Sequence, residues 1–338
     1  MRGTILYAPG DIRVEDRPDP IIGEPTDAII RTVATCVCGS DLWPYRGIDE
    51  VTEPRAIGHE YVGVVEEVGS EVTRLRPGQF VVGGFYASDG TCPHCRAGFQ
   101  FSCLNQAGFD GCQSAYIRIP QADGTLFATP EQPDDDLIPS LLALSDVMST
   151  GWHAAVTAGV RPGSTVAVVG DGAVGLSAVL AARELGAERI IALSRHASRQ
   201  RIAADFGATD IVAERGDEGV AAVMELTDGV GADAVCEAVG TAESMTQAVQ
   251  SVRPGGVVGV VGVPHGIELP VSQLFFRNVG VKGGPASVPQ YLPELLDKVL
   301  TRAIDPGKVF DLELPLERAA DAYAAMDERR AIKVLLRP

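Results

Sequence analysis

The chain has 338 residues, enough for about two domains of ordinary size, and 46% apolar with 22% charged residues is typical of a soluble globular protein. The formal net charge of −17 argues against general binding of nucleic acid or anionic membranes, because those partners attract clustered Lys and Arg. The N-terminal sequence carries charges every few residues and no run of about 18 apolar residues occurs, so we expect a cytoplasmic protein without a membrane partner.

Short β-type runs occupy the first 145 or so residues, at 28–33, 61–68 and 79–82, separated by Gly, Pro and Asp turns. They predict a mostly β domain. From about Thr150 the pattern changes to apolar strands that alternate with Ala-rich helical stretches. The successive runs read TVAVVG, AVGLSAVLAARELGA, RIIAL, SRQRIAADFGA and DIVA. This alternation predicts βαβ units, with a parallel sheet covered by helices.

The same alternation continues through ADAVCEAVG and GGVVGVVGVP to about Gly284. Beyond it, 291–300 and 316–326 are typical of helices and AIKVLLRP of a closing strand. Periodicity alone leaves open whether the last 50 or so residues return to the first domain.

A glycine-rich segment, TVAVVGDGAVGL, lies between an apolar β run and a helix. Gly170, Gly172 and Gly175 have the GxGxxG spacing, and Val174 lies within it. Glycines at these positions permit a tight strand-to-helix turn, close approach of the backbone to a pyrophosphate, and close packing of helix on strand. The segment therefore predicts a dinucleotide site.

The end of the second strand indicates which dinucleotide binds. An Asp or Glu at that point would bind the ribose 2′-hydroxyl of NAD, but the sequence has Ser194 followed by Arg195. A hydroxyl and a guanidinium can bind a 2′-phosphate, so NADP(H) is the expected cofactor, with Arg199 as a further contact. The alternative is that Arg195, Arg199 and Arg201 form a solvated helix face.

Two short motifs in the first domain contain groups suited to zinc. CGSD supplies Cys38, Ser40 and Asp41, and GHE supplies His59 and Glu60 at the head of a β run. A catalytic zinc needs three protein ligands and one open position, so a thiolate and an imidazole alone are insufficient. Taken singly, each residue also has a structural interpretation as a buried, turn or capping group.

Several motifs in order resemble the zinc-dependent branch of the medium-chain dehydrogenase/reductase family. They are CGSD, GHEYVGVVEEVGSEV, a cysteine-bearing lobe, SDVMSTGWHAA, the GxGxxG unit and AYAAMDERRAIKVLLRP, and they span essentially the whole chain. The resemblance implies an α/β protein with a GroES-like, mostly β catalytic domain, 1–149 with 289–338. A Rossmann domain with a doubly wound parallel sheet, 150–288, is inserted and binds NADP.

The resemblance also implies that Cys38 and His59 bind a catalytic zinc. The family's third ligand is a Cys, a Glu or an Asp, and the matching position in SDVMSTGWHAA is Asp146, as in bacterial secondary-alcohol dehydrogenases. An alternative role for Asp146 is the N-cap of the helix that it opens.

The remaining residues of the two motifs match further family roles. Glu60 matches a carboxylate that coordinates zinc transiently, and Asp41 matches the group that holds the His59 ring through its other nitrogen. Ser40 matches the hydroxyl that hydrogen-bonds the substrate oxygen. The implied reaction is hydride transfer between an alcohol and the nicotinamide, with zinc as Lewis acid, and it yields an aldehyde or a ketone.

The cysteine lobe departs from the family's structural zinc pattern, C-x2-C-x2-C-x7-C. The segment TCPHCRAGFQFSC supplies three cysteines, Cys92, Cys95 and Cys103. Gly98 and Gln106 stand where the third and fourth cysteines would fall in this alignment. Two alternatives stay open: a zinc with an outside fourth ligand such as Asp89 or His94, or an empty lobe.

Trp43 is a second departure, because many relatives have at this position a His that extends the proton relay. An indole has no basic nitrogen, so either protons leave through the nicotinamide ribose and water, or Trp43 mainly lines the substrate pocket. Further aromatic residues lie in segments that match the pocket: Phe85, Tyr86, Phe109 and Trp152.

The expected partner is a small alcohol, aldehyde or ketone, and relatives are usually homodimers or homotetramers. Two other functions are considered: a zinc-free quinone or enoyl reductase of the same superfamily, and a cofactor-binding protein without turnover. The combination of Cys38, His59 and Asp146 argues against the first, and the complete set of candidate site residues argues against the second.

Overall fold

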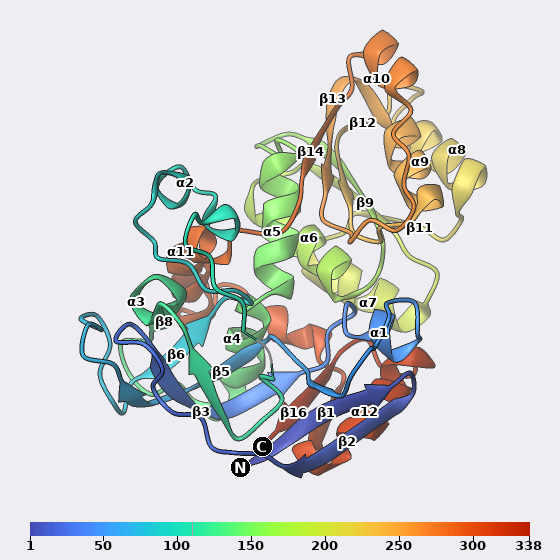
Figure 1. The fold of residues 1–338 in the computed structure, drawn as a ribbon. Coiled ribbons are helices and arrows are strands. Elements are labelled where there is room, and N and C mark those ends of the chain that lie inside the picture. Colours follow the sequence, from blue (N-terminus) through green and yellow to red (C-terminus); the bar gives the residue numbers. More distant parts are fainter. Residues whose placement is uncertain (110) are drawn as a thin grey trace. The chain divides into compact units, whose positions relative to one another are not determined.

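The computed structural model describes residues 1–109 and 111–338. Its backbone contacts divide the chain into two compact units, Met1–Asp146 with Ser287–Pro338, and Val147–Ala286 (Figure 1). The domain limits expected above, 1–149 with 289–338 and 150–288, stay a prediction. Among the described residues, no helix combines the length and apolarity that crossing a membrane requires.

The first unit, Met1–Asp146 with Ser287–Pro338, is mostly β. One sheet has the order β2-β1-β4, formed by Asp11–Asp16 (β2), Arg2–Ala8 (β1) and Arg55–Ala56 (β4). A larger sheet has the order β15-β16-β3-β5-β6-β8, and β7 also pairs with β3. Its strands are Ala28–Cys36 (β3), Tyr61–Val68 (β5), Phe80–Gly83 (β6), Tyr116–Ile119 (β7), Leu126–Ala128 (β8), Leu312–Pro315 (β15) and Val334–Arg337 (β16).

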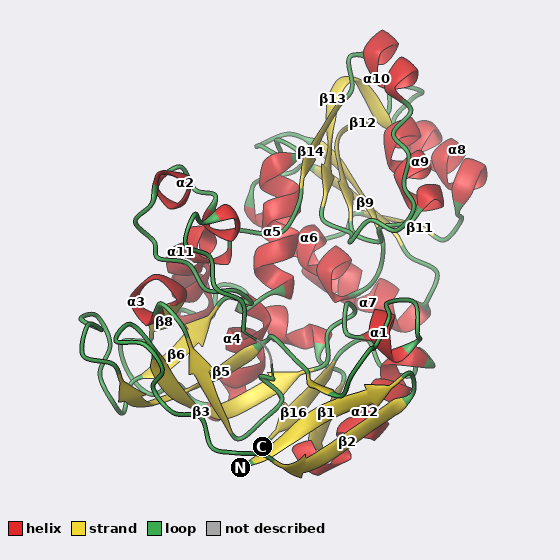
Figure 2. Ribbon diagram, in the orientation of Figure 1, coloured by secondary structure: helices red, strands yellow, loops and turns green. Residues whose placement is uncertain are grey.

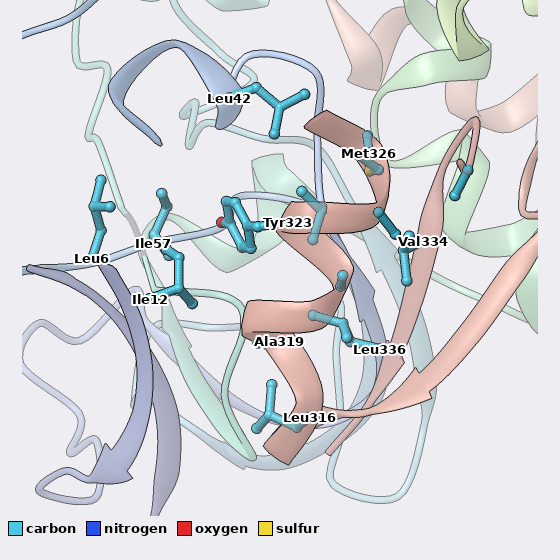
Figure 3. Close-up of a cluster of buried hydrophobic side chains, with 14 residues drawn as sticks. Leu6, Ile12, Leu42, Ile57, Leu316, Ala319, Tyr323, Met326, Val334 and Leu336 are labelled. Atoms are coloured by element: carbon cyan, nitrogen blue, oxygen red, sulfur yellow. The ribbon is translucent and has the colours of Figure 1, made fainter. Parts of the chain in front are cut away.

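Short helices connect these strands. The α-helices are Leu42–Tyr45 (α1), Pro93–Arg96 (α2), Ala122–Thr125 (α3), Ile138–Leu144 (α4), Val288–Leu300 (α11) and Ala319–Asp327 (α12). The 3₁₀ turns are Gln100–Ser102, Asp135–Leu137, Pro306–Val309 and Leu316–Arg318. One core cluster joins β1 to α12 and β16: Leu6, Ile57, Tyr323 and Leu336 are all buried in it (Figure 3).

The C-terminal strand β16 pairs with β3 next to the CGSD motif. Leu335 lies opposite Cys36 and Leu336 opposite Thr35 in an antiparallel ladder. Leu335 and Leu336 are fully buried, so the apolar run of the C-terminus contributes to the core of the first unit. The structure thereby answers the question that periodicity left open about the end of the chain.

The second unit, Val147–Ala286, contains a parallel sheet. Its order is β11-β10-β9-β12-β13-β14, which is the 3-2-1-4-5-6 order of the doubly wound dinucleotide-binding fold. The strands are Asp210–Val212 (β11), Arg189–Leu193 (β10), Thr165–Val169 (β9), Ala232–Glu237 (β12), Val252–Val260 (β13) and Gly280–Gly283 (β14). Together with the mostly β first unit, this sheet confirms the expected fold class.

Helices cover both faces of this parallel sheet (Figure 2). They are Val147–Thr157 (α5), Ala173–Glu184 (α6), Ala197–Phe206 (α7), Gly216–Leu226 (α8), Ala242–Ser251 (α9) and Val271–Arg277 (α10). The strands β9 and β10 are apolar and buried on both faces, as parallel strands between helices are. The glycine turn follows β9, and Ser194 follows β10, so both lie at the carboxyl edge of the sheet, where ligands bind in this fold.

Candidate active site

Four potential metal ligands of the first unit converge from three separate segments. Cys38 lies two residues after β3, His59 and Glu60 directly precede β5, and Asp146 follows α4. One ligand atom from each lies within 4.8 Å of the others. Cys38, Glu60 and Asp146 are buried and His59 is half-buried. The fold thus brings together groups that lie up to 108 residues apart in sequence.

The spacing of the donor atoms fits a zinc ion. Cys38 Sγ lies 3.6 Å from Asp146 Oδ2, and His59 Nε2 lies 3.4 Å from the same oxygen. Zinc bonds of about 2.0–2.3 Å arranged tetrahedrally would separate a sulfur from an oxygen by about 3.6 Å and a nitrogen from an oxygen by about 3.4 Å. Thiolate, imidazole and carboxylate are all ordinary zinc ligands. The residues present therefore fit the metal that the resemblance implies.

The His59 ring is held from its far side by a buried network. Its Nδ1 lies 3.5 Å from Asp41 Oδ1, and Asp41 Oδ2 accepts a hydrogen bond of 2.9 Å from the Cys38 amide. Gln113 Nε2 lies 3.4 Å from Asp41 Oδ2 and donates at 3.0 Å to the Tyr323 hydroxyl. This arrangement leaves Nε2 of His59 facing Cys38 and Asp146. Gln113 and Tyr323 are not predicted from the sequence, because no local motif connects them to the CGSD segment.

Glu60 forms a buried ion pair that no local sequence motif indicates. Its Oε1 lies 2.6 Å from Lys333 Nζ, and both side chains are at most 1% exposed. Lys333 Nζ also donates to the Val37 carbonyl at 3.2 Å. The other carboxylate oxygen, Oε2, is buried and has no hydrogen-bond partner among the described residues. A buried oxygen without a partner beside the other ligands is consistent with a cation at this position.

The cluster concentrates acidic groups in a largely buried place. Burial raises the pKa of the Cys38 thiol, and the neighbouring Glu60 and Asp146 carboxylates raise it further. Burial also raises the pKa of Glu60, although Lys333 opposes that shift. A divalent cation would remove the repulsion among these groups and hold the thiol in its ionised form.

Ser40 lies in the turn between β3 and α1, Trp43 lies within α1, and both residues are half-buried. The segment is fixed by backbone hydrogen bonds from Trp43 N to Ser40 O and from Asp41 N to Cys38 O, each 3.2 Å long. Ser40 follows Cys38 by two residues, so its hydroxyl belongs to the same short segment. The residue at position 43 is a tryptophan, whose indole cannot accept a proton.

The aromatic residues expected near the substrate pocket have different surroundings. Phe85 packs edge-on against the His59 ring, with 6.1 Å between ring centroids, so it lies beside the candidate metal ligands. Tyr86 is 3% exposed and packs against Phe85 in the interior. Phe109 packs against Tyr61 and the core, and Trp152, in the second unit, is 2% exposed. Phe85 is therefore placed to contact a candidate catalytic residue, His59.

The cysteine lobe contains a second cluster, and it corrects the alignment used above. Asp89, Cys92, Cys95 and Cys103 place their ligand atoms within 4.8 Å of one another. Their spacing is D-x2-C-x2-C-x7-C, so the family pattern is present with Asp89 in place of the first cysteine. The alignment that left Gly98 and Gln106 at vacant positions was shifted by one ligand and is wrong. His94 lies outside this cluster, and its Nδ1 is 2.6 Å from the Ser102 carbonyl.

Backbone amides surround the donor atoms of this lobe. Amides of Cys95 and Leu104 donate to Cys92 Sγ at 3.5 Å each, and those of Asp89 and Asn105 donate to Cys103 Sγ at 3.4 Å each. Amide donors stabilise the thiolate form that binds metal. The lobe is therefore organised around its sulfur atoms.

The glycine turn has the geometry that its sequence predicts. Gly170 has a φ of +119°, a value that favours glycine, and a Cβ at Gly175 would lie 2.0 Å from the Gly170 carbonyl oxygen. A Cβ at Gly172 would meet no atom within 4 Å, so this position faces open space. Val174 lies in the first turn of α6, half-buried. These features leave room for close approach of a diphosphate to the helix N-terminus.

Ser194 and Arg195 follow β10, and Arg199 lies on α7. Asp171, which the sequence did not single out, contacts Ser194 and Arg199. The Asp171 carboxylate accepts a hydrogen bond of 3.0 Å from Ser194 Oγ and pairs with Arg199 Nη1 at 2.9 Å. Burial would raise the pKa of Asp171, but the Arg199 charge and the hydrogen bonds outweigh it and lower the pKa. Arg195 is exposed, as is Arg201.

Comparison with known proteins assigns both halves of the chain to one family. Residues 24–131 match the family model described as alcohol dehydrogenase GroES-like domain, and residues 173–301 match the model described as zinc-binding dehydrogenase. The first match lies in the mostly β unit. Most of the second match lies in the unit with the parallel sheet.

Individual relatives match over the whole length. A zinc-type alcohol dehydrogenase B of Aspergillus flavus is 33% identical, over 100% of this chain and 81% of its own. An NADP-dependent isopropanol dehydrogenase of Thermoanaerobacter brockii is 34% identical, over 91% of each chain. The solved structure of an alcohol dehydrogenase from Thermus sp. ATN1 has a TM-score of 0.92 and 33% identity, covering 100% of this chain and 99% of its own.

Proposed function

The chain belongs to the zinc-binding alcohol dehydrogenases of the medium-chain dehydrogenase/reductase family, and we propose that it interconverts a primary or secondary alcohol with its aldehyde or ketone, using NADP. Membership of this family makes it an oxidoreductase that uses zinc and a nicotinamide cofactor. The observation that carries the proposal is the convergence of Cys38, His59 and Asp146 at distances that suit tetrahedral zinc.

Cys38, His59 and Asp146 would hold the catalytic zinc, with Glu60 as a transient ligand. Zinc bound there supplies a Lewis acid, which favours the ionised form of an alcohol and polarises a carbonyl group. Asp41 fixes the orientation of His59 through Nδ1, so that Nε2 faces the other donors. Lys333 compensates the Glu60 charge while Oε2 remains available.

Ser40 would hydrogen-bond the substrate oxygen and pass its proton towards solvent. A hydroxyl both donates and accepts, so it can take the proton from an alcohol and release it in the same arrangement. The indole of Trp43 cannot continue the relay, and we assign it to the wall of the substrate pocket together with Phe85.

The glycine turn and the end of β10 would bind NADP. Gly170, Gly172 and Gly175, with Val174, would receive the diphosphate, and Ser194, Arg195 and Arg199 the 2′-phosphate. The nicotinamide supplies the hydride chemistry. Support for NADP over NAD comes from the absence of an acid at position 194 and from the relative that is named as NADP-dependent.

The lobe around α2 would hold a second, structural zinc. Its ligands would be Asp89, Cys92, Cys95 and Cys103, a closed set of four without a free position for substrate. This assignment chooses Asp89 over His94 as the fourth ligand, because the Asp89 carboxylate lies among the three sulfur atoms.

We also propose that the protein forms homodimers or homotetramers in the cytoplasm. Three apolar side chains of α10, Val271, Phe275 and Phe276, are 70–80% exposed, and β14 is an edge strand of the parallel sheet. A second copy of this chain would cover both. The reduced thiols of Cys38, Cys92 and Cys95 suit a reducing compartment.

The experiment that tests the reaction is a rate measurement by nicotinamide absorbance with a panel of aldehydes, ketones and alcohols. We expect turnover with NADPH or NADP, and for Cys38→Ala a rate about three orders of magnitude lower, because the metal supplies several kcal/mol of stabilisation. Cys236→Ala, which removes a buried thiol from β12, should retain both its zinc and its rate.

Full turnover by Cys38→Ala would favour a zinc-free reductase of the same superfamily. Binding of NADPH without turnover of any carbonyl or alcohol in the panel would favour a protein that binds the cofactor without catalysis.

A further inference from the structure

The middle residue of the GxG turn carries a carboxylate that reaches the neighbouring strand. Asp171 stands between Gly170 and Gly172 and is 7% exposed. Its Oδ2 accepts the hydrogen bond from Ser194 Oγ at 3.0 Å and lies 3.3 Å from the Arg195 amide. The other oxygen, Oδ1, pairs with Arg199. The carboxylate therefore lies at the carboxyl end of β10, although its Cα lies on the turn after β9.

This position matters because an acid at the end of the second strand is what selects NAD in dinucleotide-binding folds. The strand itself has Ser194 there, but the turn supplies a carboxylate to the same place from a different element. Sequence spacing along the second strand does not reveal this carboxylate, because Asp171 lies on the turn after β9. Its contacts with Arg199 and Ser194 favour the charged form at neutral pH.

Asp171 also binds two of the groups expected to contact a 2′-phosphate. The Ser194 hydroxyl already donates to Asp171, and the Arg199 guanidinium is paired with it. A phosphate that approaches these groups meets a fixed negative charge and must compete for both donors. A ribose 2′-hydroxyl, in contrast, can donate a hydrogen bond to a carboxylate.

We propose that Asp171 is a residue that determines the specificity for the dinucleotide. Its carboxylate accepts a hydrogen bond from the ribose 2′-hydroxyl of NAD and repels the 2′-phosphate of NADP. Ser194, Arg195 and Arg199 favour NADP, and Asp171 reduces the difference in affinity between NADP and NAD without reversing it. The inference rests on the proposed use of a nicotinamide dinucleotide by this site.

The test is the dissociation constant of NADPH and of NADH, measured by isothermal titration calorimetry without substrate. Asp171→Asn keeps the shape of the side chain and removes its charge. We expect NADPH binding to tighten by about 5- to 10-fold and NADH binding to weaken by about 10-fold, as loss of a hydrogen bond to a charged group implies. The same titrations with 2′,5′-ADP and 5′-ADP isolate the effect of the 2′-phosphate.

Glu188→Gln is the matched control. Glu188 is an exposed acid that directly precedes β10, at the opposite end of the strand from Ser194, so its removal changes the net charge equally. Both dissociation constants should stay within about 2-fold of the original protein. If Asp171→Asn fails to fold, Asp171→Ser gives the same comparison, because a serine keeps a polar group without the charge.

The direction of the change distinguishes the outcomes. Weaker NADPH binding in the Asp171 variants, with NADH unchanged, would overturn the proposal, because Asp171 would then serve only to position Arg199 for the phosphate. Equal changes for both cofactors would also overturn it. The protein could also turn over no alcohol in the panel and still show the expected opposite changes in the NADPH and NADH dissociation constants. That result would support the role of Asp171 and contradict the proposed reaction.

Discussion

Lys333 and Glu60 form an ion pair in the interior of the first unit, and its two partners lie 273 residues apart in sequence. A buried charge that loses its partner is costly, because neither water nor another group replaces the interaction. Lys333→Met should therefore lower the free energy of unfolding by about 3–5 kcal/mol, measured by urea denaturation of the metal-loaded protein.

Lys333→Arg is the control, because it keeps the positive charge near Glu60, and most of the stability should remain. An unchanged urea midpoint in Lys333→Met would contradict the stabilising role of this pair.

Asp89 provides a second test at the level of a single residue. Asp89→Ala should reduce the zinc content by one ion per chain, measured by atomic emission, and lower the melting temperature, because a structural zinc contributes directly to folding. His94→Ala should leave the zinc content unchanged. The reverse result, zinc lost with His94 and kept without Asp89, would show that the fourth ligand has been misassigned.

The sequence alone predicts the role of some site residues and not of others. Cys38, His59 and the glycines belong to short motifs, so their spacing along the chain indicates a role. Asp171, Gln113 and Lys333 act through contacts between separate elements, and nothing in their local sequence marks them. The alignment of the cysteine lobe on its cysteines is one position out of register, because the first position of the D-x2-C-x2-C-x7-C spacing is Asp89.

At the level of elements, the turn from β9 to α6 offers two glycines with different constraints. A Cβ at Gly175 collides with the Gly170 backbone, whereas a Cβ at Gly172 meets only open space. Gly175→Ala should lower the melting temperature, because the backbone must shift to accommodate the new atom. Gly172→Ala should keep the melting temperature and weaken NADPH binding by about 10-fold or more, since the new methyl blocks the close approach of the diphosphate.

Calorimetric titration with NADPH and a thermal melt of each variant separate the two effects. Unaltered NADPH affinity in Gly172→Ala would mean that the diphosphate binds elsewhere.

The helix α10 provides the test of self-association. Replacing both Phe275 and Phe276 by Ser removes the most exposed aromatic surface of the second unit, so the dimer or tetramer should dissociate to monomers in sedimentation experiments. Val230→Ser, which alters another exposed apolar residue of the same unit, should leave the assembly intact. A double variant that sediments like the original protein would exclude this surface from the interface.

Local pattern was a good guide to the elements. The runs predicted at 28–33 and 61–68 correspond to β3 and β5, and the run at 291–300 lies within α11. Their periodicity reflects which face is buried, a property that neighbouring residues share. The run predicted as one helix at 316–326 is a 3₁₀ turn followed by α12, because the chain changes geometry after Arg318.

At the level of the whole molecule, two observations lie beyond local pattern: β16 pairs with β3, and Asp146 meets Cys38. Both depend on contacts between distant segments, which periodicity does not encode. Resemblance to a family supplied these relations in advance, because shared motif order implies shared topology. The family comparisons and the strand order of the parallel sheet confirm the fold that the resemblance implied.

The zinc dependence of turnover tests the proposed function most directly. The protein is dialysed against a zinc chelator, its zinc content is measured, and the rate of nicotinamide oxidation with a carbonyl substrate is followed before and after zinc is restored. We predict that the rate falls by about 10³-fold or more as the catalytic zinc is lost and recovers in proportion to the zinc that is rebound. A rate that persists in protein free of zinc would contradict the assignment of Cys38, His59 and Asp146 as a catalytic metal site.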